Sequence, residues 1–129
     1  SDKKVFYIVK ENCFGLTKIL NNKEINYNAA ILDPPSFAKS KNEVEGALKG
    51  YRDLMINTVN LLAVDGIIGF YTCSHHISID DIISIGYKAA LHSDCDLQIL
   101  EFAMQDSDHP YMIKDKTNFY LKGYIAKKI

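Results

Sequence analysis

Short apolar runs alternate with amphipathic stretches along this chain, and that alternation constrains the fold more than any single residue. The strand-like runs are rich in β-branched and aromatic residues and cover residues 4–10, 27–33, 67–73, 97–104 and 118–127. Stretches with helical periodicity separate the first four runs, at residues 14–20, 44–62 and 78–91, and we expect Asn12 to be the N-cap of the first and Ser78 that of the third. We therefore predict an α/β protein with a parallel sheet, whose last two strands form an antiparallel pair because no helix separates them.

Composition narrows the class of protein and the compartment. The 129 residues, 47% of them apolar and 24% charged, suit one soluble domain. No run approaches the roughly 18 to 20 apolar residues of a membrane helix, and the first residues lack the apolar segment of a signal peptide. The three cysteines are widely spaced and odd in number, which is untypical of a disulfide framework. We expect a cytoplasmic protein without a membrane partner.

Polar residues follow the predicted strands at their carboxyl ends, where ligands bind in open α/β sheets. The segments at these ends are Asn12, Asp33-Pro34-Pro35 and Cys73-Ser74-His75-His76. The two prolines end a strand and fix a rigid loop that can grip the edge of a planar base. A plain turn in which Asp33 caps backbone amides is an equally good interpretation of this motif alone.

Cys73 is a candidate nucleophile, because neighbouring imidazoles and loop amides can stabilise a thiolate. An inert packing cysteine is the commoner reading of such a position, and Cys13 and Cys95 receive that interpretation. A metal site is conceivable, but none of the thiol and imidazole groups has zinc-finger spacing, and we predict no metal. The residues concerned are Cys73, His75, His76 and His109.

A local basic patch surrounds the Pro-Pro loop, although the net charge of the chain is only −1. Its cations are suited to hold phosphates and its aromatic rings to stack on bases, while a solvated helix face with core aromatics is the commoner explanation. The patch consists of Lys39, Lys41, Lys49 and Arg52 with Phe37 and Tyr51. No glycine motif of the dinucleotide-binding or P-loop type is present in the sequence.

The order of these motifs resembles the C-terminal half of the bacterial large-subunit ribosomal RNA cytosine-5 methyltransferases, which are class I S-adenosylmethionine (SAM) enzymes. The matching segments are Asn12, 33–37, 49–53, 72–74, 108–110 and 120–124. The resemblance implies a Rossmann-like class I methyltransferase sheet that is N-terminally truncated, so that residues 1–129 are a partial domain. The first SAM-binding strands and an RNA-binding PUA domain would lie upstream of Ser1.

The resemblance also implies roles for individual residues. Asn12, Asp33 and Pro34 would contact SAM, and Cys73 would add to C6 of a cytosine in ribosomal RNA and activate C5. Asp33 would stabilise the charge at N3, so that Cys73 and Asp33 form the catalytic pair. The residues expected to bind the RNA substrate are Pro35, Phe37, Lys49, Tyr51 and Arg52.

Two alternative functions remain open. An amino-group methyltransferase of RNA also uses an Asp-Pro-Pro loop, but it would favour an aromatic residue at Ser36 and would not need Cys73. A non-catalytic fragment that serves only as an interaction module is the other alternative. Because residues 27–33 would otherwise form a bare sheet edge, we expect residues 4–10 to slide in beside them or a second copy to pair there as a homodimer, with a slight preference for the slide.

Overall fold

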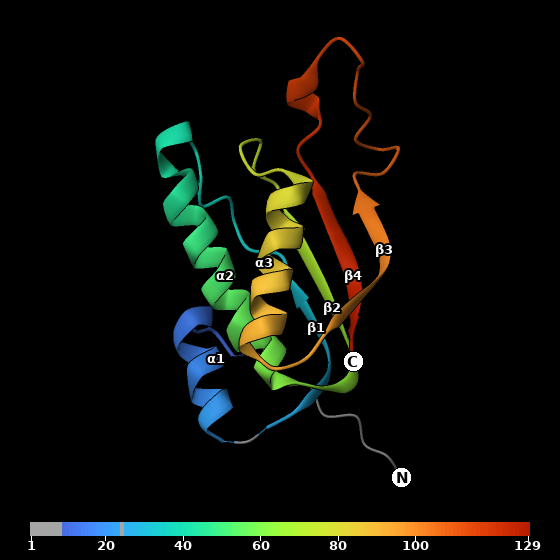
Figure 1. Cartoon of the computed structure of the whole chain (residues 1–129). Coiled ribbons are helices and arrows are strands. Elements are labelled where there is room, and N and C mark those ends of the chain that lie inside the picture. Colours follow the sequence, from blue (N-terminus) through green and yellow to red (C-terminus); the bar gives the residue numbers. More distant parts are fainter. Residues whose placement is uncertain (1–8, 24) are drawn as a thin grey trace.

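A four-stranded sheet with helices on one face forms the protein, and the computed structural model describes residues 9–23 and 25–129 of it (Figure 1). The strands are β1 (Tyr27–Leu32), β2 (Leu62–Thr72), β3 (Leu97–Met104) and β4 (Lys122–Lys128). The helices are α1 (Cys13–Asn22), α2 (Val44–Leu61) and α3 (Ile79–His92), with single 3-10 turns at Lys41–Glu43 and Lys116–Asn118. Helices α2 and α3 cover the sheet side by side, and α1 packs beside α2.

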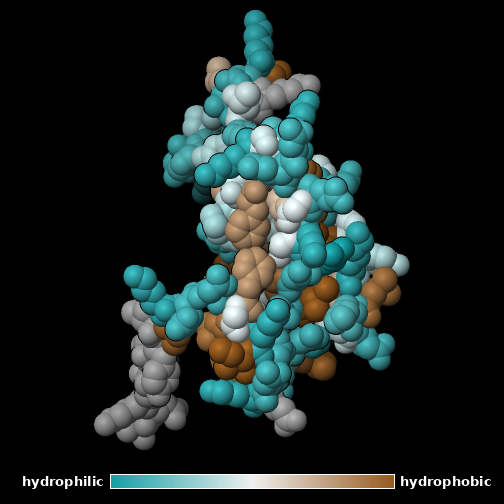
Figure 2. Space-filling model, turned by 90° about the vertical axis from the view of Figure 1, so that its left-hand side faces the viewer, coloured by the Kyte–Doolittle hydropathy of each residue, from teal (hydrophilic) through white to brown (hydrophobic). Residues whose placement is uncertain are grey.

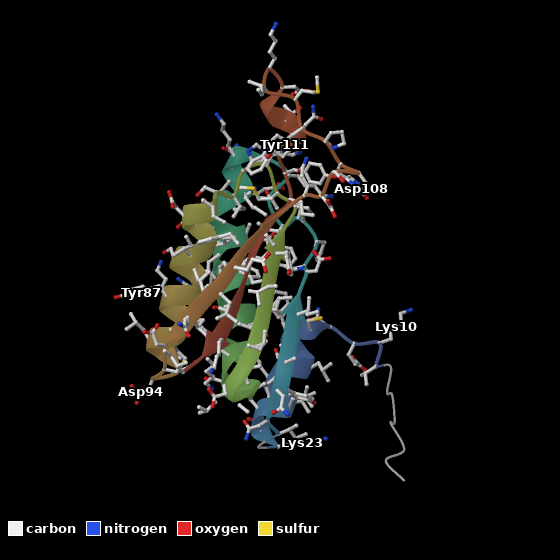
Figure 3. All side chains as sticks on the ribbon, turned by 90° about the vertical axis from the view of Figure 1, so that its right-hand side faces the viewer. Lys10, Lys23, Tyr87, Asp94, Asp108 and Tyr111 are labelled. Carbon is white, nitrogen blue, oxygen red and sulfur yellow. The ribbon has the colours of Figure 1, made fainter. Side chains whose placement is uncertain are left out.

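The strand order is β1-β2-β4-β3, and Figure 3 shows the strands from the β3 side. Strands β1 and β2 are parallel, whereas β4 runs antiparallel to both of its neighbours. The predicted α/β architecture and the antiparallel pair of the last two strands are therefore confirmed. The predicted parallel direction holds for β1 and β2, and β3 runs in that direction too, because both β2 and β3 are antiparallel to β4. The insertion of β4 between β2 and β3 was not predicted.

Helix boundaries follow side-chain caps. Asn12 caps α1, because its Oδ1 accepts a hydrogen bond of 2.9 Å from the amide of Phe14. Ser78 and Asp81 form a reciprocal capping box at the start of α3. Both predicted N-caps are confirmed.

The start of β2 departs from the sequence prediction. Helix α2 ends at Leu61, one residue before the end of the predicted helical stretch, but β2 begins at once at Leu62 instead of at residue 67. The Lys128 ammonium donates hydrogen bonds of 2.9 Å to the carbonyl of Val59 and 2.7 Å to that of Leu62. A cation from β4 therefore satisfies carbonyls at the helix end, a contact between distant segments that local periodicity does not reveal.

The core lies between the sheet and the two covering helices. Strands β2 and β4 contribute fully buried apolar residues to it, and α2 and α3 contribute the facing layer. Its members include Ile68, Phe70, Tyr124 and Ala126 from the sheet, and Tyr51, Met55, Val59, Ile82 and Ala89 from the helices. In contrast, the view onto α1 and α2 in Figure 2 shows hydrophobic side chains exposed among hydrophilic ones.

Strand β1 is an edge strand within the described part of the chain, where it pairs only with β2. Ile31, in the middle of this strand, is 78% exposed. Most of the strand expected at residues 4–10 lies outside the described residues, and Val9 and Lys10 belong to no strand. The slide and the homodimer both stay predictions. Over residues 9–23 and 25–129, no helix has the length and apolar character needed to cross a membrane.

Candidate functional site

Three strands end at one edge of the sheet, and the candidate site lies there. The carboxyl ends of β1, β2 and β3 share this edge with the amino end of β4. Leu32 is paired with Phe70 and Thr72 with Lys122, so Asp33 and Cys73 follow the ends of adjacent strands. The sequence prediction that their chemistry gathers at one rim is consistent with this register.

A cavity of about 440 Å³ opens at the end of β1. Its lining includes all three residues predicted to contact the cofactor, namely Asn12, Asp33 and Pro34, together with Pro35 and Phe37. Asp33 is exposed to solvent. The start of α1 therefore closes one side of a hollow whose other side is the Pro-Pro loop.

Cys13 also lines this cavity and is exposed. That position corrects the interpretation of Cys13 as a packing residue, because a buried role requires contacts that an exposed thiol lacks. Cys95 is half-buried, and burial raises the pKa of its thiol, which suits an inert role. Cys73 is also half-buried. In the part of the chain that the structure describes, it is not among the residues that line the Asp33 cavity.

Tyr51 holds the Pro-Pro loop from below. Its hydroxyl donates to the carbonyl of Pro35 and accepts from the amide of Phe37, both over 3.1 Å. Its ring stacks on Phe37 with the ring centres 4.7 Å apart. Because Tyr51 is 0% exposed, it has no free face for a base, and the expectation that it binds substrate is wrong. Its place on the apolar stripe of α2 was the signal for this core role.

The turn after β2 is joined to the Pro-Pro loop through Ser74. The buried Ser74 hydroxyl donates a 3.1 Å hydrogen bond to the carbonyl of Ala38. That same carbonyl accepts a 3.0 Å bond from the Ser36 hydroxyl. The segments that carry Asp33 and Cys73 are therefore tied to each other directly beyond the strand ends.

Lys122, which was not among the predicted site residues, contacts the turn that carries Cys73. The Lys122 residue is 5% exposed. Its ammonium donates hydrogen bonds to the carbonyl of Ser74 at 2.8 Å and to that of Tyr120 at 3.2 Å. Burial lowers the pKa of this amine, and the nearby Cys73 and Asp81 act in the opposite direction. The available signal was a single lysine inside the apolar run 120–126.

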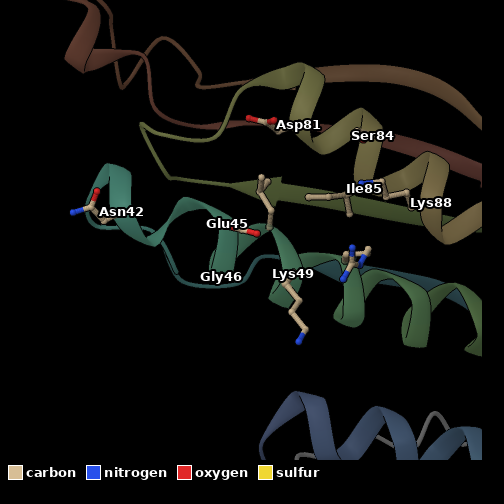
Figure 4. Close-up of a pocket in the computed structure, with 10 residues that line it drawn as sticks. Asn42, Glu45, Gly46, Lys49, Asp81, Ser84, Ile85 and Lys88 are labelled. Atoms are coloured by element: carbon tan, nitrogen blue, oxygen red, sulfur yellow. The ribbon is translucent and has the colours of Figure 1, made fainter.

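The predicted basic patch is divided by the structure. Lys49 and Arg52 line a different cavity, of about 610 Å³, between α2 and α3, to which Lys88 and Asp81 also contribute. In Figure 4 the Lys49 side chain extends away from α3. Neither cation lines the Asp33 cavity, and their contact with RNA stays a prediction.

His75 and His109 contact different neighbours. The His75 ring lies 5.7 Å from that of Tyr120, and His109 pairs with Asp108 over 3.1 Å, which lowers the pKa of that carboxyl. Within residues 9–23 and 25–129, no cluster of three His, Cys, Asp or Glu residues is arranged to hold a metal ion.

The sequence is similar to proteins of known name, although no protein-family model matches it. It is 36% identical over 119 residues to the ribosomal RNA large subunit methyltransferase I of Aeromonas hydrophila. The match covers 92% of this chain and 30% of that protein. The chain thus spans about a third of the length of such relatives.

Solved structures share the fold. SMU.776, described as a methyltransferase and complexed with SAH, superimposes with a TM-score of 0.75 at 24% identity, over 91% of this chain and 30% of that one. A Streptococcus mutans protein described as a SAM-dependent methyltransferase gives a TM-score of 0.74 at 22% identity, over 91% and 29%. The described sheet and its helices thus have the Rossmann-like fold of class I methyltransferases.

Proposed function

We propose that this chain carries part of the active site of a SAM-dependent ribosomal RNA methyltransferase that methylates C5 of a cytosine through a Cys73 adduct. The observation that carries the proposal is the joining of the Asp33 cavity and the Cys73 turn by the Ser74 hydrogen bond to Ala38. The 36% identity with a ribosomal RNA large subunit methyltransferase supports it.

The Asp33 cavity suits the cofactor chemically. SAM presents an adenine with hydrogen-bond donors and acceptors, and it would supply an electrophilic methyl group on its sulfonium. Asn12 and Asp33 offer polar side chains to the cavity, and Pro34, Pro35 and Phe37 supply rigid apolar walls. These residues would hold the cofactor beside the strand that ends in Asp33.

The reaction requires a nucleophile from the protein, because C5 of cytosine is itself too weakly nucleophilic to attack the methyl group of SAM. The Cys73 thiolate would add to C6, and the electron pair of the C5–C6 bond would make C5 enamine-like. Asp33 would stabilise the charge at N3 during this addition. After methyl transfer, loss of the C5 proton would restore the double bond and expel the Cys73 thiolate.

We also propose that this chain is one part of a larger methyltransferase domain. Within the described residues, strand β1 pairs with β2 on one side and with no strand on the other. Its apolar residue Ile31 is 78% exposed. Proteins rarely leave such an edge open. The chain's match to only 30% of its relative agrees with a partner strand supplied by another segment.

Product analysis tests the proposed chemistry. The intact protein that carries this sequence is incubated with ribosomal RNA and SAM bearing a deuterated methyl group, and the digested nucleosides are identified by mass spectrometry. We expect 5-methylcytidine, at a rate that Asp33→Asn lowers about 100-fold. A methyl group on an exocyclic amine would overturn the proposal in favour of the amino-group methyltransferase.

A further inference from the structure

Lys122 is a buried cation that the proposed chemistry does not use. The residue is almost completely enclosed by protein, and proteins rarely bury a lysine unless an anion pairs with it. In the part of the chain that the structure describes, its ammonium forms no ion pair with an Asp or Glu carboxylate. A buried ammonium of this kind requires a compensating negative charge from some other group.

The contacts of Lys122 place its ammonium against the turn that carries Cys73. Strand β4 is paired with β2 so that Lys122 lies opposite Thr72, and Cys73 follows Thr72 directly. The ammonium donates a 2.8 Å hydrogen bond to the carbonyl of Ser74, which is the residue after Cys73. A second bond of 3.2 Å goes to the carbonyl of Tyr120. Since an ammonium has three protons, one of them is left to face an anion beside this turn.

The titratable neighbours of Lys122 identify that anion. Cys73 as a thiolate and Asp81 as a carboxylate both act to raise the pKa of the Lys122 amine, against the effect of burial. Asp81 is already engaged in the capping box of α3, where its carboxylate accepts two hydrogen bonds. His75 and Tyr120, which lie against each other, carry no negative charge at neutral pH. Strand β3 contributes only apolar side chains to the cavity that Lys122 lines.

We propose that Lys122 is a positioning residue that holds Cys73 as a thiolate, an inference that rests on the proposed function. On the proposed route the sulfur attacks C6 as an anion, and it leaves as an anion when the C5 proton is lost. A fixed cation beside the turn stabilises the sulfur in both of these states, and the proton of the free thiol passes to solvent before the attack. Lys122 therefore acts through Cys73 and not on the RNA.

Thiol alkylation tests this pairing in the absence of RNA and SAM. The intact protein that carries this sequence is treated with iodoacetamide at a series of pH values, and mass spectrometry of the digest gives the rate at each of the three cysteines. We expect Lys122→Gln to slow alkylation of Cys73 about tenfold at neutral pH and to move its rise to higher pH, because the thiolate is the reactive form. The rate at the exposed Cys13 should be the same in both proteins.

A second substitution separates the charge of Lys122 from its hydrogen bonds. Glutamine keeps N–H donors for the Ser74 and Tyr120 carbonyls but carries no charge, whereas arginine keeps both. Lys122→Arg is therefore expected to hold the alkylation rate of Cys73 within about threefold of that of the unaltered protein. A lysine that only ties the two carbonyls together would not produce this difference between the two variants.

A reciprocal measurement leaves the buried lysine in place. Since the coupling between two charges is mutual, removal of the thiolate must lower the pKa of Lys122. In protein labelled with ¹³Cε-lysine, NMR titration is expected to show a lower pKa for Lys122 in Cys73→Ala than in the unaltered protein. Cys95→Ala, at the other half-buried thiol, is the matched control and should leave that titration unchanged.

Two results would overturn this inference. An unaltered alkylation rate of Cys73 in Lys122→Gln would show that the ammonium does not stabilise the thiolate, and an unaltered Lys122 titration in Cys73→Ala would show that the two charges do not interact. If Lys122→Gln fails to fold, Cys95 becomes reactive as well, and the reciprocal titration decides alone. Both effects in a protein that makes no 5-methylcytidine would contradict the proposed function and leave the ion pair standing.

Discussion

Tyr51 contributes to the candidate site without reaching the solvent. Its hydroxyl makes two hydrogen bonds to the Pro34-Pro35 loop, and its ring lies between Phe37 and Phe70. The loop's prolines cannot donate hydrogen bonds of their own, so this phenol is a main tie between the loop and α2. The position of Asp33 in its cavity therefore depends on a residue in the core.

Tyr51→Phe tests that dependence. The variant keeps the ring contacts but leaves the Pro35 carbonyl and the Phe37 amide without their partner, and we expect a loss of roughly 1 to 2 kcal/mol in the free energy of unfolding. Urea denaturation measures it. Tyr87→Phe, at a 63% exposed tyrosine of α3, is the matched control and should change stability by less than about 0.5 kcal/mol. Equal effects of both substitutions would show that the phenol does not brace the loop.

Sequence reasoning at the residue scale succeeded where a motif determines its own local structure. Asn12 and Ser78 were recognisable as helix caps, and Asp33 as the end of a strand, because each effect acts within a few residues. Lys122 was not recognisable as a site residue, because its role depends on carbonyls of Ser74 and Tyr120, one of which lies 48 residues away.

At the scale of elements, the contact between α3 and β4 depends on a glycine. The buried Tyr124 hydroxyl donates a 3.2 Å hydrogen bond to the carbonyl of Ile82 on α3. A Cβ atom at Gly86 would collide with that hydroxyl, so the absence of a side chain allows β4 and α3 to approach. The same burial raises the pKa of Tyr124 far above its ordinary value.

Gly86→Ala is expected to destabilise the protein by roughly 1 to 3 kcal/mol, although alanine normally favours a helix over glycine. Thermal or urea unfolding gives the value. Because the collision is with the phenol oxygen, Tyr124→Phe should relieve part of it, so the double variant is expected to lose less than the sum of the two single losses. Strict additivity would mean that the two residues do not compete for the same space.

At the scale of the whole molecule, the sheet order is the feature that residue patterns could not supply. The strand at 97–104 was predicted with its observed bounds and the antiparallel pairing of the last two strands was correct, yet nothing local places β4 between β2 and β3. That placement decides the site, because it brings Lys122 beside the Cys73 turn and leaves β1 as an edge.

The central claim is that Cys73 is the nucleophile of a methyl transfer to cytosine C5. Its most direct test is covalent trapping of the intact protein that carries this sequence, with SAM and ribosomal RNA in which 5-fluorocytosine replaces cytosine. Fluorine at C5 removes the proton whose loss expels the thiolate, so the adduct should survive on a denaturing gel. We predict that Cys73→Ala abolishes the adduct, whereas Cys13→Ala, at the exposed thiol of the Asp33 cavity, and Cys95→Ala retain it. An adduct that persists in Cys73→Ala and disappears in Cys13→Ala would contradict the claim.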